Sequence, residues 1–142
     1  SHKYARRQWN LVDNKELDYH YLGDFDDDML SVLKSEKNIK KTAVQEIWHN
    51  DGDQILAYMR GDLVFVFNFS PSRSYSDYGF LVPEGAYEVM LNTDSKLYGG
   101  NGLADDTITH FTNSDKLYAK DHKGWLMLYI PARSAVVLRR KE

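Results

Sequence analysis

The chain has 142 residues, close to the commonest size of one domain, and its 42% hydrophobic and 27% charged residues are typical of a globular protein. The formal net charge of −3, with no basic block, argues against a general nucleic-acid binder. The absence of cysteine excludes disulfides, zinc–thiolate sites and a cysteine nucleophile, and it suits a reducing compartment, so we expect a cytoplasmic protein.

The first forty residues are predicted to be helical. Apolar side chains recur every three to four positions, which places them on one helix face: Leu17, Tyr21, Phe25, Met29 and Leu33. Asp13 and Glu16, three residues apart, fit a capping box just before this pattern. We therefore assign residues 1–41 to a helical segment. No apolar run approaches 18 residues, so we expect no membrane contact.

From Thr42 onward the pattern changes to short strands joined by turns. The predicted strands are 44–48, 54–59, 63–69, 86–91, 125–130 and 135–138. The run 63–69 is apolar on both faces, which predicts a central strand. The last two runs are expected to form a final pair, and residues 96–123 are expected to be mostly loop. We assign residues 42–142 to an antiparallel β-sandwich, which makes the chain mainly β.

Tight turns are expected between several of these strands. Asp51-Gly52 is typical of a hairpin turn, and Arg60-Gly61-Asp62 is better explained as turn chemistry than as an adhesion tripeptide. Pro83-Glu84-Gly85 is expected to turn the chain into the run 86–91.

The stretch FNFSPSRSYSDYGF, residues 67–80, interleaves aromatic and polar residues after the apolar run. One interpretation is a sugar-binding surface, because tyrosine rings stack on the C–H faces of pyranose rings. The other is a strand that leaves the core and runs along a sheet edge with one face packed. We favour packing for Tyr75 and Tyr78, and we keep them with Arg73 as candidate sugar-binding residues.

Other patterns predict no catalytic residue, no metal site and no cofactor. The acidic run Asp24–Asp28 fails as a calcium loop, because Met29 stands where that loop needs glycine. Asn68-Phe69-Ser70 is formally a glycosylation sequon, but no secretory signal gives it meaning. The histidines lack zinc spacing, and no nucleophile elbow, P-loop or dinucleotide fingerprint is present.

Six motifs nevertheless occur in an order and spacing that resemble a known family. They are Tyr4-Ala-Arg-Arg-Gln-Trp9, Leu11-Val-Asp13, Tyr21-Leu-Gly-Asp-Phe-Asp26, Arg60-Gly-Asp-Leu-Val-Phe-Val-Phe-Asn-Phe69, Ser74-Tyr-Ser-Asp-Tyr78 and Tyr98-Gly-Gly100. Together they closely resemble the C-terminal part of 1,4-alpha-glucan branching enzymes, from about Lys3 to Val137.

The resemblance implies an enzyme of the alpha-amylase superfamily that cleaves an alpha-1,4 linkage and transfers the freed chain to a 6-hydroxyl. Its catalytic carboxylates lie in a (β/α)8 barrel, upstream of the segment seen here, and no position of this chain matches them. Residues 1–41 resemble the end of that barrel, and the rest resembles the C-terminal all-β domain. The implied partners are the barrel of the same chain and an alpha-glucan such as glycogen or amylose.

Two positions depart from the family. Ser70 stands where the family often has histidine, and Gly99-Gly-Asn101-Gly-Leu103 replaces a common Gly-Gly-His-Gly-Arg. The loss of that arginine weakens the case for glucan contact by this loop.

Three functions follow as hypotheses. The first is a non-catalytic C-terminal fragment of a branching enzyme, which stabilises the barrel and helps to position glucan. The second is a free-standing glucan-binding module whose stacking platforms would be Tyr75, Tyr78, Trp48 or Trp125. The third is an independent enzyme that uses acidic-loop carboxylates such as Asp105, Asp106 or Asp121.

Overall fold

The computed structural model describes residues 44–93 and 106–141, so the predicted helical segment 1–41 and the acidic run Asp24–Asp28 lie outside the described residues. The strands are β1 (Gln45–Asn50), β2 (Ile55–Arg60), β3 (Leu63–Asn68), β4 (Tyr75–Pro83), β5 (Ala86–Asn92), β6 (Thr109–Phe111), β7 (Asn113–Ser114), β8 (Lys123–Ile130) and β9 (Ser134–Arg140). A short 3₁₀ helix, η3 (Ala119–Asp121), lies between β7 and β8. Within these ranges no helix has the length and apolar character needed to cross a membrane.

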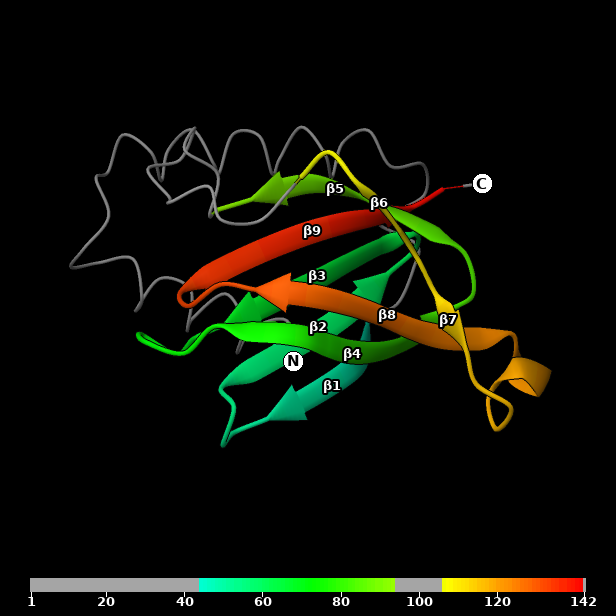
Figure 1. Cartoon of the computed structure of the whole chain (residues 1–142), viewed down its shortest axis with the longest axis horizontal. Helices are drawn as coiled ribbons and strands as arrows, with labels where there is room; N and C mark the ends of the chain where they lie inside the picture. Colours follow the sequence, from blue (N-terminus) through cyan, green and yellow to red (C-terminus); the bar gives the residue numbers. More distant parts are fainter. Residues whose placement is uncertain (1–43, 94–105, 142) are drawn as a thin grey trace.

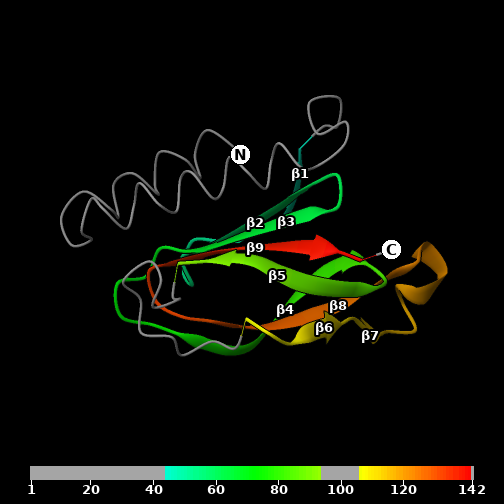
Figure 2. The same ribbon diagram turned by 90° about the horizontal axis from the view of Figure 1, so that it is seen from above.

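The strands form two antiparallel sheets packed face to face (Figures 1 and 2). The larger sheet has the order β1-β2-β3-β9-β5-β6, and the smaller has the order β4-β8-β7. All pairings in both sheets are antiparallel. The predicted antiparallel β-sandwich is therefore confirmed, and β3 is central in the larger sheet as its apolar sequence predicted.

The core lies between the two sheets and takes its residues from alternate positions of the strands. The larger sheet contributes Ile55, Ala57, Met59, Val64, Val66, Tyr87 and Leu138, and the smaller contributes Phe80, Val82, Leu126, Leu128 and Ile130. Tyr87 is fully buried, and its hydroxyl donates a hydrogen bond to the Pro83 carbonyl at 2.7 Å. That bond satisfies the one polar atom that this large side chain brings into the core.

The larger sheet is also apolar on the face that points away from the smaller sheet. Tyr58, Phe65 and Phe67 are buried there, and Phe69 continues the row. Tyr58 stacks on Phe65, its direct partner across the strands, with ring centroids 4.9 Å apart, and on Phe67 at 5.9 Å. We call these four residues the outer aromatic face. A strand apolar on both sides is typical of a sheet that is covered on both sides.

The β1–β2 hairpin was predicted correctly, but its turn is longer than the Asp-Gly pair alone would give. Asn50 pairs with Ile55, so four residues form the loop. The left-handed conformation falls on Gln54, with φ of 60°, rather than on Gly52. Asn50 Oδ1 accepts the Asp53 backbone N–H at 2.9 Å, and this bond holds the loop in its shape.

The prediction that the last two runs pair with each other was wrong. The strand β8 belongs to the smaller sheet and β9 to the larger, where β9 lies between β3 and β5. The intervening Pro131–Arg133 segment crosses between the layers, and its backbone is held by other parts of the chain. Arg133 N–H donates to the Ser70 carbonyl at 3.0 Å, and Ala132 N–H donates to Ser74 Oγ at 2.9 Å.

The segment predicted as mostly loop also contains two short strands within its described part. The strand β6 pairs with β5 in the larger sheet, and β7 pairs with β8 in the smaller one. A single residue separates them, so this stretch passes directly from one sheet to the other. Strands of three and two residues are too short to show an alternating pattern in the sequence.

Asn68 organises the corner where the chain crosses from β3 to β4. Its side chain is 1% exposed, and Nδ2 donates to the Arg73 carbonyl at 2.9 Å and to the Pro131 carbonyl at 3.1 Å. Its Oδ1 accepts the Ser70 N–H at 2.9 Å. The formal sequon is therefore closed to glycosylation in the folded domain, because its carboxamide is buried and bonded at both ends.

Candidate functional site

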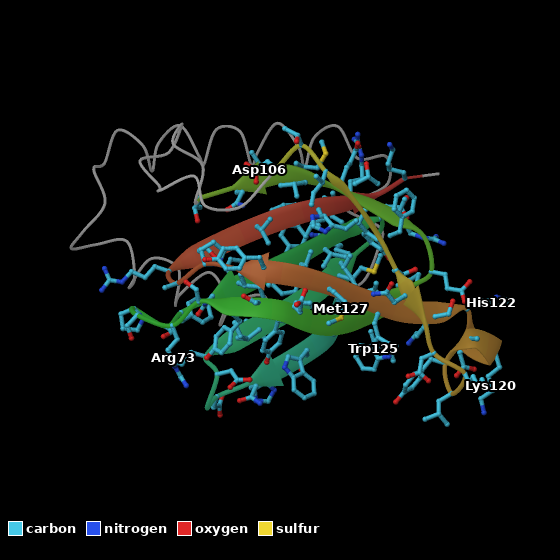
Figure 3. The ribbon with its side chains drawn as sticks, viewed as in Figure 1. Arg73, Asp106, Lys120, His122, Trp125 and Met127 are labelled. Carbon is cyan, nitrogen blue, oxygen red and sulfur yellow. The ribbon has the colours of Figure 1, made fainter. Side chains whose placement is uncertain are left out.

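The three predicted glucan-binding residues lie where both sheets have an edge. The strand β1 is at one end of the larger sheet, and β4 is at one end of the smaller. The expectation that the Phe67–Phe80 stretch includes an edge strand is thus confirmed. Tyr75 and Tyr78 pack against the core from β4. Arg73 lies just before β4 in the chain and is labelled in Figure 3. All three approach the β1–β2 turn.

Tyr78 joins this edge to the turn through its hydroxyl group. The hydroxyl donates to Asp53 Oδ2 at 2.8 Å and accepts the indole N–H of Trp48 at 2.9 Å. Its ring lies 5.3 Å from that of Phe80, which is part of the core. One side chain therefore connects β4, the end of β1 and the turn that follows it.

Tyr75 and Arg73 make parallel contacts with the same turn. The Tyr75 hydroxyl donates to the Asp53 carbonyl at 2.8 Å, and its ring meets Tyr78 edge-on at 5.3 Å. The Arg73 guanidinium donates to the Gly52 carbonyl and lies 5.8 Å from the centre of the Tyr75 ring. We call Trp48, Asp53, Arg73, Tyr75 and Tyr78 the edge cluster.

The electrostatics of the edge cluster favour a protonated Tyr78. Burial raises the pKa of Tyr78 to about 12, the Trp48 hydrogen bond lowers it, and the bond and charge of Asp53 raise it. The phenol thus stays neutral at physiological pH and donates its proton to the carboxylate. Such a group serves as a structural hydrogen-bond donor rather than as an acid–base catalyst, whose pKa would lie near the working pH.

The geometry shows these residues engaged with each other. Both tyrosine hydroxyls bond to Asp53, and the two rings lie on the core-facing side of β4 rather than on an open surface. The most exposed ring of the edge cluster is Trp48, at 45%. Glucan binding by Arg73, Tyr75 and Tyr78 stays a prediction, and the contacts favour packing.

Asp53 is the member that the sequence did not reveal. It follows the Asp51-Gly52 pair, where a carboxylate is unremarkable as turn chemistry. Only the folded chain brings it next to two tyrosines of β4, more than twenty positions away in sequence. To predict this contact one would need to know that β1 and β4 are edge strands of the two sheets and lie near each other, and this depends on the order of strands in each sheet.

The other predicted side chains lie elsewhere. Trp125 is on β8, away from Arg73, in Figure 3. Asp106 accepts a hydrogen bond from Asn92 Nδ2 at 2.9 Å, whereas Asp121 is exposed on η3. Figure 3 shows Asp106 far from Lys120 and His122, the neighbours of Asp121. These carboxylates do not converge on a common bond, and Asp105 lies outside the described residues.

Within residues 44–93 and 106–141, no cluster of three or more histidine, aspartate or glutamate side chains is arranged to hold a metal ion.

The sequence is similar to a known domain family and to known enzymes, and the family agrees with the observed fold. The family described as "Alpha amylase, C-terminal all-beta domain" matches residues 47–141. The 1,4-alpha-glucan-branching enzyme of Saccharomyces cerevisiae is 38% identical over 143 residues, which cover 100% of this chain and 20% of the relative. That of Debaryomyces hansenii is 35% identical and is covered to 21%. The chloroplastic/amyloplastic enzyme of Oryza sativa subsp. japonica is 38% identical over 81% of this chain and 14% of its own length. The chain thus spans about a fifth of the length of the yeast relatives it matches.

Proposed function

Because this chain belongs to the alpha-amylase C-terminal all-beta domain family, we propose that it serves as the non-catalytic C-terminal part of a 1,4-alpha-glucan branching enzyme. The observation that carries the proposal is identity of 38% with the Saccharomyces cerevisiae enzyme across 100% of the chain. In the parent enzyme, alpha-1,4-glucan would be cleaved and rejoined as an alpha-1,6 branch. The substrate would be an alpha-glucan such as glycogen or amylose, acted on by a barrel that precedes this segment.

The role proposed for the domain is to stabilise that barrel, and the outer aromatic face supports this role. Tyr58, Phe65 and Phe67 are buried on the side of the larger sheet that the smaller sheet does not cover. Each buried aromatic side chain contributes roughly 1.5–3 kcal/mol relative to an exposed one. A sheet that is apolar on both faces needs a covering layer on each, and chain that precedes β1 would supply the second.

The described residues show no arrangement of carboxylates suited to catalysing the transfer themselves. Glycoside transfer with retention needs two carboxyl groups about 5–5.5 Å apart that flank one bond. Asp106 is bonded to Asn92, Asp53 is bonded to Tyr78, and Asp121 stands apart on η3. The proposal therefore gives the domain a supporting rather than a reacting part.

A segment exchange tests the proposal. The corresponding fifth of the Saccharomyces cerevisiae enzyme is replaced by this chain, and alpha-1,6 linkages formed on amylose are counted with a debranching assay. We expect the chimera to branch amylose and the yeast enzyme lacking the segment to be inactive. The isolated chain should form no branches above a heat-treated control. A folded but inactive chimera, or branching by the isolated chain, would overturn the proposal.

A further inference from the structure

The β1–β2 turn brings an aspartate and a glycine together in a chemically reactive order. Asp51-Gly52 is the only step within residues 44–93 and 106–141 at which aspartate or asparagine is followed by glycine. The Asp51 side chain is 87% exposed, so it is free to rotate. Gly52 has no Cβ, so no side chain of its own shields its backbone nitrogen. Such an aspartate can close a five-membered ring with the backbone that follows it.

The ring closes when the Gly52 backbone nitrogen attacks Cγ of the protonated Asp51 carboxyl. The N–Cγ bond forms, the Cγ–OH bond breaks, and the hydroxyl leaves as water together with the amide proton. Water then adds to the backbone carbonyl carbon of Asp51, and the bond from that carbon to the Gly52 nitrogen breaks. The chain now continues through the former side chain as isoaspartate. The mass is unchanged, and no atom is oxidised or reduced.

The fold leaves the attacking nitrogen of Gly52 available. The β1–β2 ladder ends at the Asn50–Ile55 pair, so this nitrogen lies outside the ladder. The turn is held instead by the Gly52 carbonyl, which accepts from Arg73, and by the backbone and carboxylate of Asp53. These bonds begin after the atoms that react.

An imidazole lies beside the oxygen that has to leave. His49 Nε2 is 3.6 Å from Asp51 Oδ1, while its Nδ1 is 3.7 Å from Glu46 Oε1. When the ring carries both protons, its Nε2–H can give a proton to the departing oxygen. His49 therefore has the position of a general acid for ring closure.

We propose that Asp51 is a site of spontaneous isomerisation to isoaspartate, and that this modification breaks the contacts of the edge cluster with the β1–β2 turn. The only co-reactant is water. The proposal does not rest on the proposed function, because it concerns the chemistry of the turn alone.

The modification acts on the edge cluster through the length of the turn. Isoaspartate adds one CH₂ group to the backbone of a four-residue loop whose ends are fixed by the Asn50–Ile55 pair. The next two residues, Gly52 and Asp53, have to absorb the extra length. They provide every acceptor by which the turn holds the neighbouring strand, and these acceptors serve Arg73, Tyr75 and Tyr78.

The first test measures formation of isoaspartate in the folded 142-residue chain. The chain is incubated in mildly acidic buffer and digested, and the peptides are analysed by electron-transfer fragmentation, which distinguishes the two linkages. Asp62 is the matched control, because it is also exposed in a turn but is followed by Leu63, which is buried and paired with Arg60. We expect isoaspartate to accumulate several-fold faster at Asp51 than at Asp62.

Asn101-Gly102 supplies a positive control for the incubation. An asparagine forms the same ring by losing ammonia, so its product is an acid and differs in mass from the starting peptide. The Asp51 product keeps its mass, and the two reactions are therefore counted separately.

Variants then test the chemistry. Asp51→Glu would need a six-membered ring and should isomerise several-fold more slowly. Gly52→Ala should also slow the reaction, although its Cβ would lie 3.3 Å from Asn50 Oδ1 and shift the turn slightly. His49→Gln should slow the reaction in the folded chain but not in urea, where the imidazole is no longer held beside the carboxyl.

Trp48 reports whether the edge cluster changes, because its indole N–H is bonded to Tyr78. In nuclear magnetic resonance spectra a second Trp48 indole signal should grow in proportion to isoaspartate at position 51. The signal of Trp125, which is bonded to Asp115 on another part of the domain, should stay single. Treatment with a protein isoaspartyl methyltransferase and S-adenosylmethionine converts isoaspartate partly back to aspartate, so it should diminish the second signal.

Three outcomes would overturn the proposal. They are the absence of isoaspartate at Asp51 after an incubation in which Asn101 has reacted, equal rates at Asp51 and Asp62, and a single unmoved Trp48 signal in chains that carry isoaspartate at position 51. None of these affects the segment exchange that tests the proposed function.

Discussion

Substitution of Tyr78 separates a packing role from a glucan-binding role at the edge cluster. Tyr78→Ala removes a ring that contacts Phe80 and Tyr75, and it removes hydrogen bonds to Asp53 and Trp48. Loss of a fully buried aromatic side chain costs roughly 3–5 kcal/mol. Because Tyr78 is only partly buried, we take about 2 kcal/mol for the ring and about 1 kcal/mol for the two bonds. The expected loss of unfolding free energy is thus about 3 kcal/mol.

The assay is urea unfolding of the 142-residue chain, combined with retention in a glycogen gel under native conditions. Tyr78→Phe keeps the ring and should lose only about 1 kcal/mol. A double-mutant cycle of Tyr78→Phe with Asp53→Ala should show a coupling of about 1 kcal/mol. Phe111→Ala is a matched aromatic control, because Phe111 is 71% exposed and its removal should change stability by about 0.5 kcal/mol or less. Unchanged unfolding by Tyr78→Ala with lost glycogen retention would refute the packing argument.

Three further predictions follow from the fold. Asn68→Ala should lower the free energy of unfolding in urea by about 2 kcal/mol, because it removes the partner of the Ser70 N–H and of the Arg73 carbonyl, while the Pro131 carbonyl keeps its bond from Ser134 Oγ. Exposed Asn113→Ala is its control, and equal effects would contradict the argument. Burial raises the pKa of Tyr87 to about 12, so as the pH rises the phenol ionises in the unfolded chain before it ionises in the folded one. The contribution of Tyr87 to stability should therefore be complete below pH 10 and should be lost between about pH 10 and 12. Tyr87→Phe should remove this fall, and an unchanged fall in the variant would contradict the reasoning. A chain shortened to begin at Lys41 should still unfold cooperatively in urea, because the core between the two sheets is made by later residues. The whole chain is expected to self-associate or to fold residues 1–40 back on the sandwich, and sedimentation distinguishes the two. Failure of the short chain to fold would place the predicted helices in the same core as the strands.

Local sequence was sufficient for most strands but not for their grouping into sheets. Alternation and turn residues located β2, β3, β5, β8 and β9 to within a few residues. They could not show that β8 and β9 belong to different layers, because that depends on hydrogen bonds such as the one from Arg133 N–H to the distant Ser70 carbonyl. Periodicity reports which face of a strand is apolar, and it carries no information about which strand lies beside it.

At the candidate site, too, local sequence identified residues but not their neighbours in space. Tyr75, Tyr78 and Arg73 could be selected from the sequence because aromatic and polar residues alternate around them. Asp53 could not, since its partner tyrosines are brought to it by the meeting of two sheet edges.

The central position of β3 has a consequence for how the domain is made. One neighbour of β3 is the adjacent hairpin strand β2, but the other is β9, whose Arg139 pairs with Leu63. During synthesis the larger sheet therefore cannot close until nearly the whole described chain has left the ribosome. Until then the apolar β3 has an open hydrogen-bonding edge, which is a template for wrong pairing. A stop codon or cleavage before Ser134 would remove β9 and leave β3 in that exposed state permanently, so such truncated products should aggregate and be degraded rather than persist as a smaller folded domain.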